Sequence, residues 1–304
     1  LILREILLII PTFLSVYLIK KKLKKIDLIH FNEITLIPTI YIFKLFFNVP
    51  FILHCRILFK KNNYFGKQIC KFLKKNINDI IAIDSDVKES LPNYLKINII
   101  HNIIHKKKIN KFNKNYNELR IGYIGSYLKF KGLENLITTV TRLKLKKFKI
   151  RLFLAGNFIK QNPILNLFKL TNNIDKKLLI KDGVTNLGHI NNLENFYKQI
   201  NIICFPSFLN ALGRQVFEAA YFKIPSIVCL DKAKSDSFIN KKTGISYKDP
   251  NSQKNLEKSI KYFYYNKNKI KIMGENAYRL VNKKFHPKKN IEKLNKLYQR
   301  NLLF

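Results

Sequence analysis

Short apolar runs rich in β-branched residues alternate along the chain with longer amphipathic stretches. Each run has the length of a strand buried on both faces, and the stretches between the runs have helical periodicity. This alternation predicts α/β architecture, with parallel sheets covered by helices on both faces. The predicted strands occupy residues 26–31, 50–55, 79–84, 96–100, 119–125, 149–156, 184–190, 200–207 and 224–230.

The predicted strands fall into two series separated by a polar stretch. Residues 106–120 are charged and have little apolar periodicity, which is typical of a connection between domains. We therefore predict two doubly wound domains that divide near residue 112. Open parallel sheets bind ligands beyond the carboxyl ends of their strands, so chemistry is expected in the loops that follow the strands.

The charge of the chain is strongly unbalanced. Among 304 residues, 57 are Lys or Arg and 19 are Asp or Glu, which gives a net charge of +38. Such an excess fits nucleic acid, an anionic membrane or an anionic substrate as partner. The lysines are scattered among Ile and Asn from end to end, so we interpret the excess mainly as compositional drift. Binding of nucleic acid favours basic residues clustered on one face with aromatics between them.

Cysteines and the N-terminal region indicate a cytoplasmic protein. Cys55, Cys70, Cys204 and Cys229 form no CxxC pair, so we predict buried, reduced thiols in place of disulfides or a zinc site. The apolar run of residues 6–19 is shorter than the roughly 20 residues that span a bilayer, and we predict a core helix there. For the lysine-rich residues 20–25, contact with anionic lipid and a solvated face are equally favoured.

The stretch "IGYIGSYLKFKGLENLI" (residues 121–137) predicts a strand, a turn and a helix. Gly125 ends the strand, and Lys131 and Gly132 precede the helix. Glycine lets the backbone approach a ligand closely, and a lysine at a helix start adds positive charge beside the helix dipole. The combination suits a diphosphate. The spacing is neither GxGxxG nor a P-loop, so an ordinary strand–turn–helix remains an equal alternative.

The stretch "NALGRQVFEAAYFKIPSIV" (residues 210–228) predicts a loop, a short helix and a strand. Loop amides at residues 211–213 and the helix N-terminus predict an anion-binding concavity. Glu218 lies four residues after Arg214, and a surface ion pair is one interpretation. The helix is apolar on most sides, however, and a carboxylate on a buried helix needs a partner, for which ribose hydroxyls are suited.

Together these stretches resemble a known family. Gly125 with Lys131 and Gly132, then "FLAG", "NLGHI", "CFPS", "NALGRQVFEAA" and "KIPSIV", then Thr243 and Gly244, resemble the motif order of family 4 glycosyltransferases. Those are retaining enzymes of the GT-B fold that use nucleotide-diphosphate sugars. The resemblance covers residues 26–298, with weaker first-half signatures such as "DLIHF" and "VPFILHC".

The resemblance implies two Rossmann-like domains that face a cleft. Residues 1–112 are expected to form the acceptor-side domain, and residues 113–285 the nucleotide-sugar-binding domain. The stretch "FHPKKNIEKLNKLY" (residues 285–298) resembles the last helix of the family, which crosses back, so residues 286–304 are expected to join the first domain. The family's N-terminal strand and Gly-rich acceptor loop have no counterpart, so the first domain is expected to be incomplete at its start.

The resemblance also implies roles for individual residues. Lys131 is expected to neutralise the donor diphosphate, Glu218 to bind the ribose, and His54 to contact the donor sugar near the reacting carbon. These three are the expected catalytic residues, and Lys131 and Glu218 also belong to the donor-binding set. The other expected donor-binding residues are Gly125, Ser126, His189, Ile190, Asn210, Ala211, Leu212, Gly213 and Arg214.

Two positions depart from the family pattern. Asn210 stands where the family has the first glutamate of a pair, and Ser126 where it has an arginine. An amide can bond a sugar hydroxyl but cannot offset positive charge, and Arg214 or Arg56 are candidates to replace the missing arginine. The "DSD" of residues 84–86 imitates a metal motif, but we predict a helix N-cap with an acidic first turn.

The resemblance implies a metal-independent, retaining, hexosyltransferase-like glycosyltransferase without a cofactor. It is expected to transfer a sugar from a UDP- or GDP-linked donor to a glycan or lipid-linked acceptor in cell-surface polysaccharide synthesis. The expected location is the cytoplasm, with peripheral contact at the inner membrane face as an open addition, and no nucleic acid is expected as partner. Two alternatives remain: an inactive relative that binds only nucleotide or a partner, and a basic nucleic-acid-binding protein.

Overall fold

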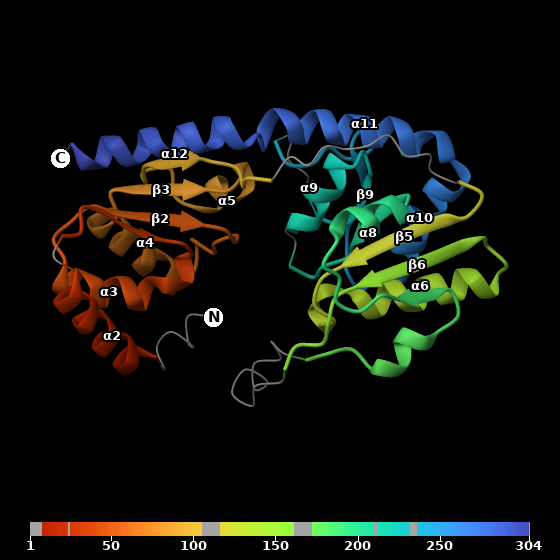
Figure 1. Ribbon diagram of the computed structural model, residues 1–304, viewed down its shortest axis with the longest axis horizontal. Helices are drawn as coiled ribbons and strands as arrows, with labels where there is room; N and C mark the ends of the chain where they lie inside the picture. Colours follow the sequence, from red (N-terminus) through yellow and green to blue (C-terminus); the bar gives the residue numbers. More distant parts are fainter. Residues whose placement is uncertain are drawn as a thin grey trace. The chain divides into compact units, whose positions relative to one another are not determined.

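The computed structural model describes residues 8–23, 25–104, 116–160, 172–209, 212–231 and 236–303. The chain divides into two compact units (Figure 1). The first unit contains Leu1–Ile103 and Phe285–Phe304, and the second contains Ile104–Lys284. The predicted boundary between residues 112 and 113 lies outside the described residues.

The first unit contains a parallel sheet with the strand order β1-β2-β3-β4. Its strands are β1 (Ile29–Phe31), β2 (Phe51–Cys55), β3 (Asp79–Ala82) and β4 (Ile97–Ile99). The helical elements of this unit are α2 (Ile9–Lys22), η1 (Ile34–Leu36), α3 (Ile37–Phe46), α4 (Tyr64–Asn76), α5 (Ser85–Ser90) and α12 (Pro287–Leu302).

The alternation of side chains along β2 builds two apolar layers in the first unit, since successive residues of a strand point to opposite faces. Phe51, Leu53 and Cys55 pack into the larger layer. Ile52 faces the other way and packs in a smaller layer with Leu297 of α12. The last helix therefore covers one face of this sheet, and in Figure 1 it runs alongside β3.

The N-terminal helix α2 differs from its prediction. A helix forms, but Val16 is its only buried residue within the described part of the chain, so the predicted core position is wrong. Its apolar residues lie on all sides, and α3 covers one side, with Phe13 and Phe46 in ring contact at 5.0 Å. Among the described helices, none is long and apolar enough to cross a membrane.

The second unit contains a six-stranded sheet with the order β10-β9-β8-β5-β6-β7, and all of its strand pairs are parallel. Its strands are β5 (Leu119–Ile124), β6 (Ile150–Ala155), β7 (Val184–Asn186), β8 (Ile202–Phe205), β9 (Ser226–Cys229) and β10 (Gly244–Tyr247). The chain first builds outwards from β5 to β7 and then returns to the other side of β5 with β8. The strand order therefore reverses between β5 and β8, which is where such sheets bind ligands.

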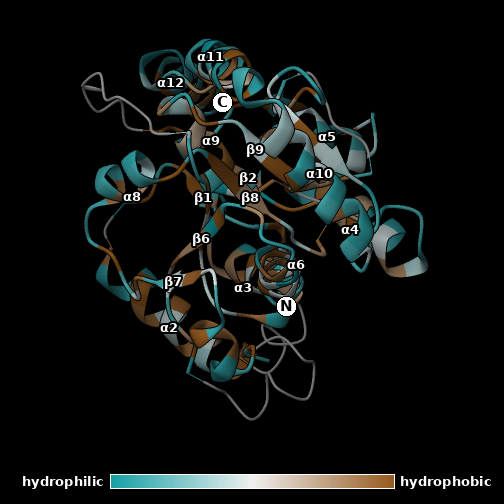
Figure 2. Cartoon of the chain, turned by 90° about the vertical axis from the view of Figure 1, so that its right-hand side faces the viewer, coloured by the Kyte–Doolittle hydropathy of each residue, from teal (hydrophilic) through white to brown (hydrophobic). Residues whose placement is uncertain are grey.

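Helices cover both faces of the second sheet. The helical elements are η2 (Lys129–Lys131), α6 (Leu133–Leu145), η3 (Lys176–Ile180), α8 (Leu193–Gln199), α9 (Arg214–Tyr221), α10 (Gln253–Tyr265) and α11 (Lys267–Lys284). Residues of α6, α10 and α11 pack in the large core on one face, and residues of α8 and α9 pack on the other. In Figure 2 much of the ribbon of α4 and α8 has the hydrophilic colour.

Each of the nine predicted strands contains an observed strand, and the predicted α/β class with parallel sheets is confirmed. The edge strand β10 was not predicted. The four cysteines are buried and unpaired, as predicted. Asp84 is the N-cap of α5, where its carboxylate accepts a bond of 2.8 Å from the Val87 amide, so the "DSD" stretch caps a helix as predicted.

Candidate functional site

Two loops meet at the point where the strand order of the second unit reverses. The Phe208 amide, after β8, donates to the Phe130 carbonyl, after β5, at 3.0 Å. Gly132 adopts a left-handed φ of +73°, and a Cβ at this position would lie 2.0 Å from the Pro206 carbonyl oxygen. Only glycine fits both the backbone conformation and the space. The sequence therefore fixes the two loops against each other at the ligand-binding edge of the sheet.

The neighbouring loops are held in the same way. The Gly125 amide donates to Ala155 at 2.9 Å, and the Gly156 amide donates to Gly188 at 2.8 Å. A Cβ on Gly156 would approach the Gly125 carbonyl to 1.9 Å. Ser126 is partly buried, and its carbonyl accepts a bond of 2.9 Å from the Tyr123 hydroxyl. The loops after β5, β6 and β7 thus form one backbone-bonded rim that includes Gly125 and Ser126.

Lys131 places an ammonium group beside the end of β8. Its Nζ lies 5.1 Å from the ring centroid of Phe130 and 5.9 Å from that of Phe205. Burial lowers the pKa of Lys131 from its ordinary value. Among the described residues no carboxylate forms an ion pair with it. A partly desolvated cation without a carboxylate partner is suited to an incoming anion.

Glu218 lies on α9, where its neighbours Phe217 and Ala219 are buried and the side chain itself is 15% exposed. One carboxylate oxygen pairs with the Arg214 Nε at 2.7 Å. The other accepts a bond of 3.2 Å from the hydroxyl of Tyr197, a buried residue of α8. The predicted burial is confirmed, but the carboxylate already has two protein partners. The ion pair with Arg214 therefore forms, and a ligand would bond to Glu218 in addition to it.

The loop before α9 is described from Leu212 onwards, and Asn210 and Ala211 lie outside the described residues. Leu212 is partly buried and packs against a cluster that includes Phe205 and Val216. Gly213 is the N-cap residue of α9 and has no side-chain cap. The helix therefore presents its N-terminal amides beyond the end of β8, on the same side of the sheet as Lys131.

His189 and Ile190 follow β7. The His189 side chain is exposed, and it comes directly after Gly188, whose φ is +62°. Ile190 is partly buried and packs against the cluster that contains Phe196 and Tyr197 of α8. Ile190 therefore anchors this loop to the core, while His189 extends from the rim.

His54 belongs to the first unit, at the end of β2. Its ring stacks on that of His30, with centroids 5.6 Å apart and planes at 14°. His30 Nδ1 lies 2.7 Å from the Tyr298 hydroxyl of α12. Burial, aided by the charge of Arg56, lowers the pKa of His54 to about 3. His54 is therefore neutral near pH 7.

Sequence reasoning missed three residues that hold the expected site residues in place. Tyr197, His30 and Tyr298 carry no motif. The pairing register could have revealed His30, which faces Ile52 across β1 and β2 and so lies on the same sheet face as His54. Tyr197 and Tyr298 depend on tertiary packing and leave no local signal.

This arrangement can be compared with known proteins. A sequence model of the family "Glycosyl transferases group 1" matches residues 105–280, more than half of the chain. The chain belongs to this family. The matched region contains both loops at the strand reversal, with Lys131 and Glu218.

Individual relatives agree with the family. The chain is 26% identical to the capsular polysaccharide biosynthesis glycosyltransferase CapM of Staphylococcus aureus, over 72% of this chain and 61% of CapM. It spans about three-fifths of the length of the curated relatives that it matches.

Solved structures show the same fold. Sucrose-phosphate synthase from Thermosynechococcus elongatus aligns with a TM-score of 0.76 at 18% identity, over 96% of this chain and 78% of that one. HepE of Anabaena in complex with UDP-glucose aligns with a TM-score of 0.73 at 15% identity, over 94% of this chain and 82% of that one. The predicted GT-B fold, with two Rossmann-like units, is confirmed.

Proposed function

We propose that this group 1 family member is a retaining glycosyltransferase of cell-surface polysaccharide synthesis. It transfers a sugar from a UDP- or GDP-linked donor to a glycan or lipid-linked acceptor. The observation that carries the proposal is the partly buried ammonium of Lys131, which pairs with no carboxylate of the described residues and lies beside two interlocked loops at the strand reversal. The relative CapM is named for capsular polysaccharide biosynthesis, and HepE was determined with UDP-glucose.

In this proposal the second unit binds the donor. The diphosphate contacts Lys131 and the N-terminal amides of α9, which stabilise the negative charge that grows on the leaving phosphate. This positive charge serves in place of a metal ion. A carboxylate has about four acceptor positions, so Glu218 can keep Arg214 and Tyr197 and still accept from ribose hydroxyls. Gly125, Ser126, His189 and Ile190 line the loops around the donor.

His54 acts in this proposal as a neutral hydrogen-bonding residue towards the donor sugar. Because its pKa is about 3, the His54 ring is neutral near pH 7. It therefore neither balances the phosphate charge nor acts as a general acid. The leaving phosphate takes the proton of the acceptor, so no side chain serves as general base. The configuration at the sugar carbon is then retained through attack on the face that the phosphate leaves.

A pair of lysine substitutions tests the donor site. Lys131→Met removes the partly buried cation, and Lys129→Met removes an exposed cation from the same short helix. A charge-assisted hydrogen bond contributes about 1.5–3 kcal/mol, so Lys131→Met should weaken UDP and GDP binding by about 10-fold to 150-fold in calorimetry. Lys129→Met should leave binding unchanged. Equal effects of the two substitutions would contradict the assignment.

An inactive relative is the second candidate. It is favoured by Ser126, which stands where the family has an arginine, so the loop after β5 offers one cation fewer to the donor. Incubation with UDP- and GDP-sugars, followed by measurement of released nucleotide and of sugar transfer to lipid-linked and free glycans, separates the two. Tight nucleotide binding without any hydrolysis or transfer would favour the inactive relative.

We also propose a cytoplasmic location with peripheral contact at an anionic membrane face. The support is the exposed apolar surface of α2, which ends in three lysines, Lys20, Lys21 and Lys22. Leu14→Glu should reduce binding to vesicles that contain anionic lipid. Leu145→Glu changes an equally apolar, exposed residue of the second unit and should not. If Leu14→Glu binds vesicles as well as the unmodified chain, or binding is independent of anionic lipid, the proposal is wrong.

A further inference from the structure

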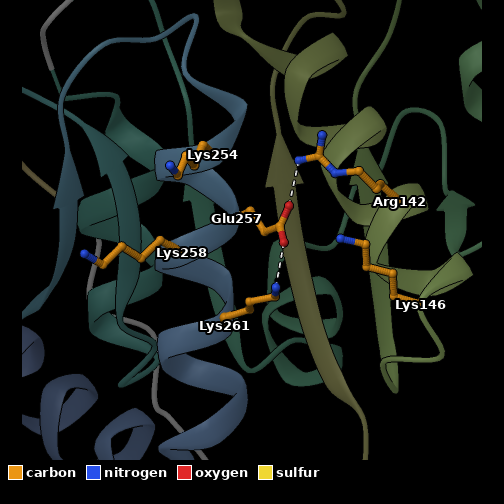
Figure 3. Close-up of a pocket in the computed structure, with 6 residues that line it drawn as sticks. All are labelled: Arg142, Lys146, Lys254, Glu257, Lys258 and Lys261. Carbon is orange, nitrogen blue, oxygen red and sulfur yellow. Dashed lines mark hydrogen bonds and ion pairs between the residues drawn. The ribbon is translucent and has the colours of Figure 1, made fainter.

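A basic groove lies between α6 and α10 in the second unit (Figure 3). It has a volume of about 550 Å³, and its lining residues are Arg142, Lys146, Lys254, Glu257, Lys258 and Lys261. α6 starts at Leu133, directly after the donor loop. Arg142 lies nine residues further on, about 14 Å along the axis at 1.5 Å per residue. The groove is therefore separate from the loops at the strand reversal.

The single carboxylate of the groove positions two of its cations. Glu257 pairs with Arg142 at 2.7 Å and with Lys261 at 2.6 Å, as the dashed lines in Figure 3 show. Arg142 also donates to the Gln253 side chain at 3.2 Å. The hydrogen bond from Lys261 is the largest of the interactions that lower the pKa of Glu257. The carboxylate therefore holds two cations of the groove in place and stays ionised.

The remaining three cations have no such partner. Lys146, Lys254 and Lys258 form no ion pair with any carboxylate in the described part of the chain. In Figure 3 the Lys146 ammonium extends towards Glu257 and Lys261, and the Lys258 ammonium extends to the opposite side of α10. Three uncompensated ammonium groups therefore surround α10 on both sides.

A second groove continues the first. It has a volume of about 360 Å³ along β10 and α10, and Lys258 lines both grooves. Lys241, Lys248 and Asn255 are among its other lining residues. Because one lysine is shared, the positive surface is continuous across α10. Its shape fits a long anion that crosses the helix better than a single small one.

We propose that these two grooves bind an extended chain of phosphate groups. Ammonium groups on flexible stems suit phosphates at variable spacing, and the fixed Arg142 adds charge at one end. The first groove is lined by no aromatic ring, so it offers no platform on which nucleic-acid bases stack. Tyr247 and Tyr262 line the second groove, and comparison with RNA tests whether bases bind there. The chemistry is shared by free inorganic polyphosphate and by a phosphodiester-linked polymer.

The bulk charge of +38 is the competing explanation, and a charge-matched control addresses it. The groove variant is Lys146→Gln, Lys254→Gln and Lys258→Gln in one chain. The control variant carries Lys67→Gln, Lys71→Gln and Lys75→Gln, which are exposed lysines of α4 in the first unit. Both variants lose three charges from the surface, so an unspecific attraction would fall equally in both.

Binding of long-chain polyphosphate to the full chain is measured at several salt concentrations. The groove variant should bind about tenfold more weakly, and the slope of log affinity against log salt should fall by about two, at about 0.7 per lost phosphate contact. The control variant should keep affinity and slope, and UDP binding should be unchanged in both. Equal losses of affinity in the two variants would overturn the proposal. So would RNA binding that is tighter than polyphosphate binding and is unchanged in the groove variant.

Two further probes identify the source of the phosphates. Inorganic polyphosphate is compared with poly(glycerol phosphate) at equal phosphate concentration. Tighter binding of the first indicates free polyphosphate as the ligand, and tighter binding of the second indicates a phosphodiester-linked polymer. Lys241→Gln with Lys248→Gln should weaken both long ligands and leave tripolyphosphate, which is short enough for the first groove, unaffected. If this pair has no effect on either long ligand, the continuous site across α10 is refuted.

Discussion

Asp79 is a carboxylate of the first unit with several polar partners. It is completely buried at the start of β3 and accepts hydrogen bonds from Asn98 at 2.9 Å, Arg300 at 2.6 Å and Asn301 at 2.8 Å. Lys96 completes the set at 3.2 Å. Arg300 and Asn301 belong to α12, so a single carboxylate joins the last helix to the sheet.

The structure sets the size of the effect of Asp79→Ala. Breaking a buried ion pair costs about 3–5 kcal/mol. The side chains of Arg300 and Lys96 are 44% and 56% exposed and regain hydration, so no buried charge is left behind. The loss of hydrogen bonds to a charged group, about 3 kcal/mol, then sets the size of the effect. The buried amide of Asn301 also loses an acceptor.

Native-state hydrogen exchange measures this effect within the first unit. Amides of α12 and β3 should exchange through a local opening of the structure. Asp79→Ala should lower the free energy of that opening by about 3 kcal/mol. Asp27→Ala removes an exposed partner of Lys25, with side chains 57% and 83% exposed, and should change protection by less than about 1 kcal/mol. Unchanged exchange of α12 in Asp79→Ala would refute the reasoning.

Three further predictions concern the loops, the histidine and the thiols. Gly132→Ala should abolish UDP binding and lower the melting temperature, because the added Cβ would lie 2.0 Å from the Pro206 carbonyl oxygen. Gly188→Ala is the control, since Gly188 has a φ of +62° but no atom within 4 Å of an added Cβ, and it should lose only about 1 kcal/mol of stability. Equal losses in the two variants would contradict the close approach at Gly132. His54 has a pKa of about 3 against 6.5 when unfolded, so the unfolded chain binds more protons between these values and stability falls as pH is lowered through them, by about 1.4 kcal/mol per pH unit. In urea unfolding, His54→Gln should remove this contribution, so that the free energy of unfolding depends less steeply on pH. An unchanged pH dependence would contradict the buried neutral state. The four buried cysteines should react with a thiol reagent only after denaturation, since burial raises the pKa of Cys204; rapid reaction of the native chain would contradict this.

The strands could be predicted because burial on both faces requires continuous apolar runs, and that requirement is local. The edge strand β10 is the exception. Its sequence "GISY" mixes glycine and serine with two apolar residues, so it has no such run. It forms because β9 offers an unpaired parallel edge, with Gly244 opposite Ser226. A Cβ at Gly244 would come within 2.2 Å of the Ser226 carbonyl, so its glycine reflects a neighbour that the sequence pattern does not reveal.

The wrong prediction at α2 and the partner of Glu218 that the sequence did not reveal share one cause. Periodicity and composition predict that α2 is an apolar helix, but not how much of it is covered, and it is largely exposed. For Glu218 the sequence predicts a carboxylate in need of a partner, and α8 supplies Tyr197 from 21 residues away. His30 and Tyr298 are 268 residues apart. Local sequence states which groups need partners, and tertiary structure decides which residues provide them.

The same distinction decides how the missing phosphate cation at Ser126 can be replaced. Arg56 donates from Nε and Nη2 to Asn32 and from Nη1 to Asn102, all within the first unit. Each of its three guanidinium nitrogens therefore already donates within the first unit. Arg214 pairs with Glu218 through Nε alone, on a side chain that is 66% exposed. Because the Nη groups form the outer end of the fork, Arg214 can offer them to a phosphate at the N-terminus of α9 without releasing Glu218, and it is the better candidate of the two.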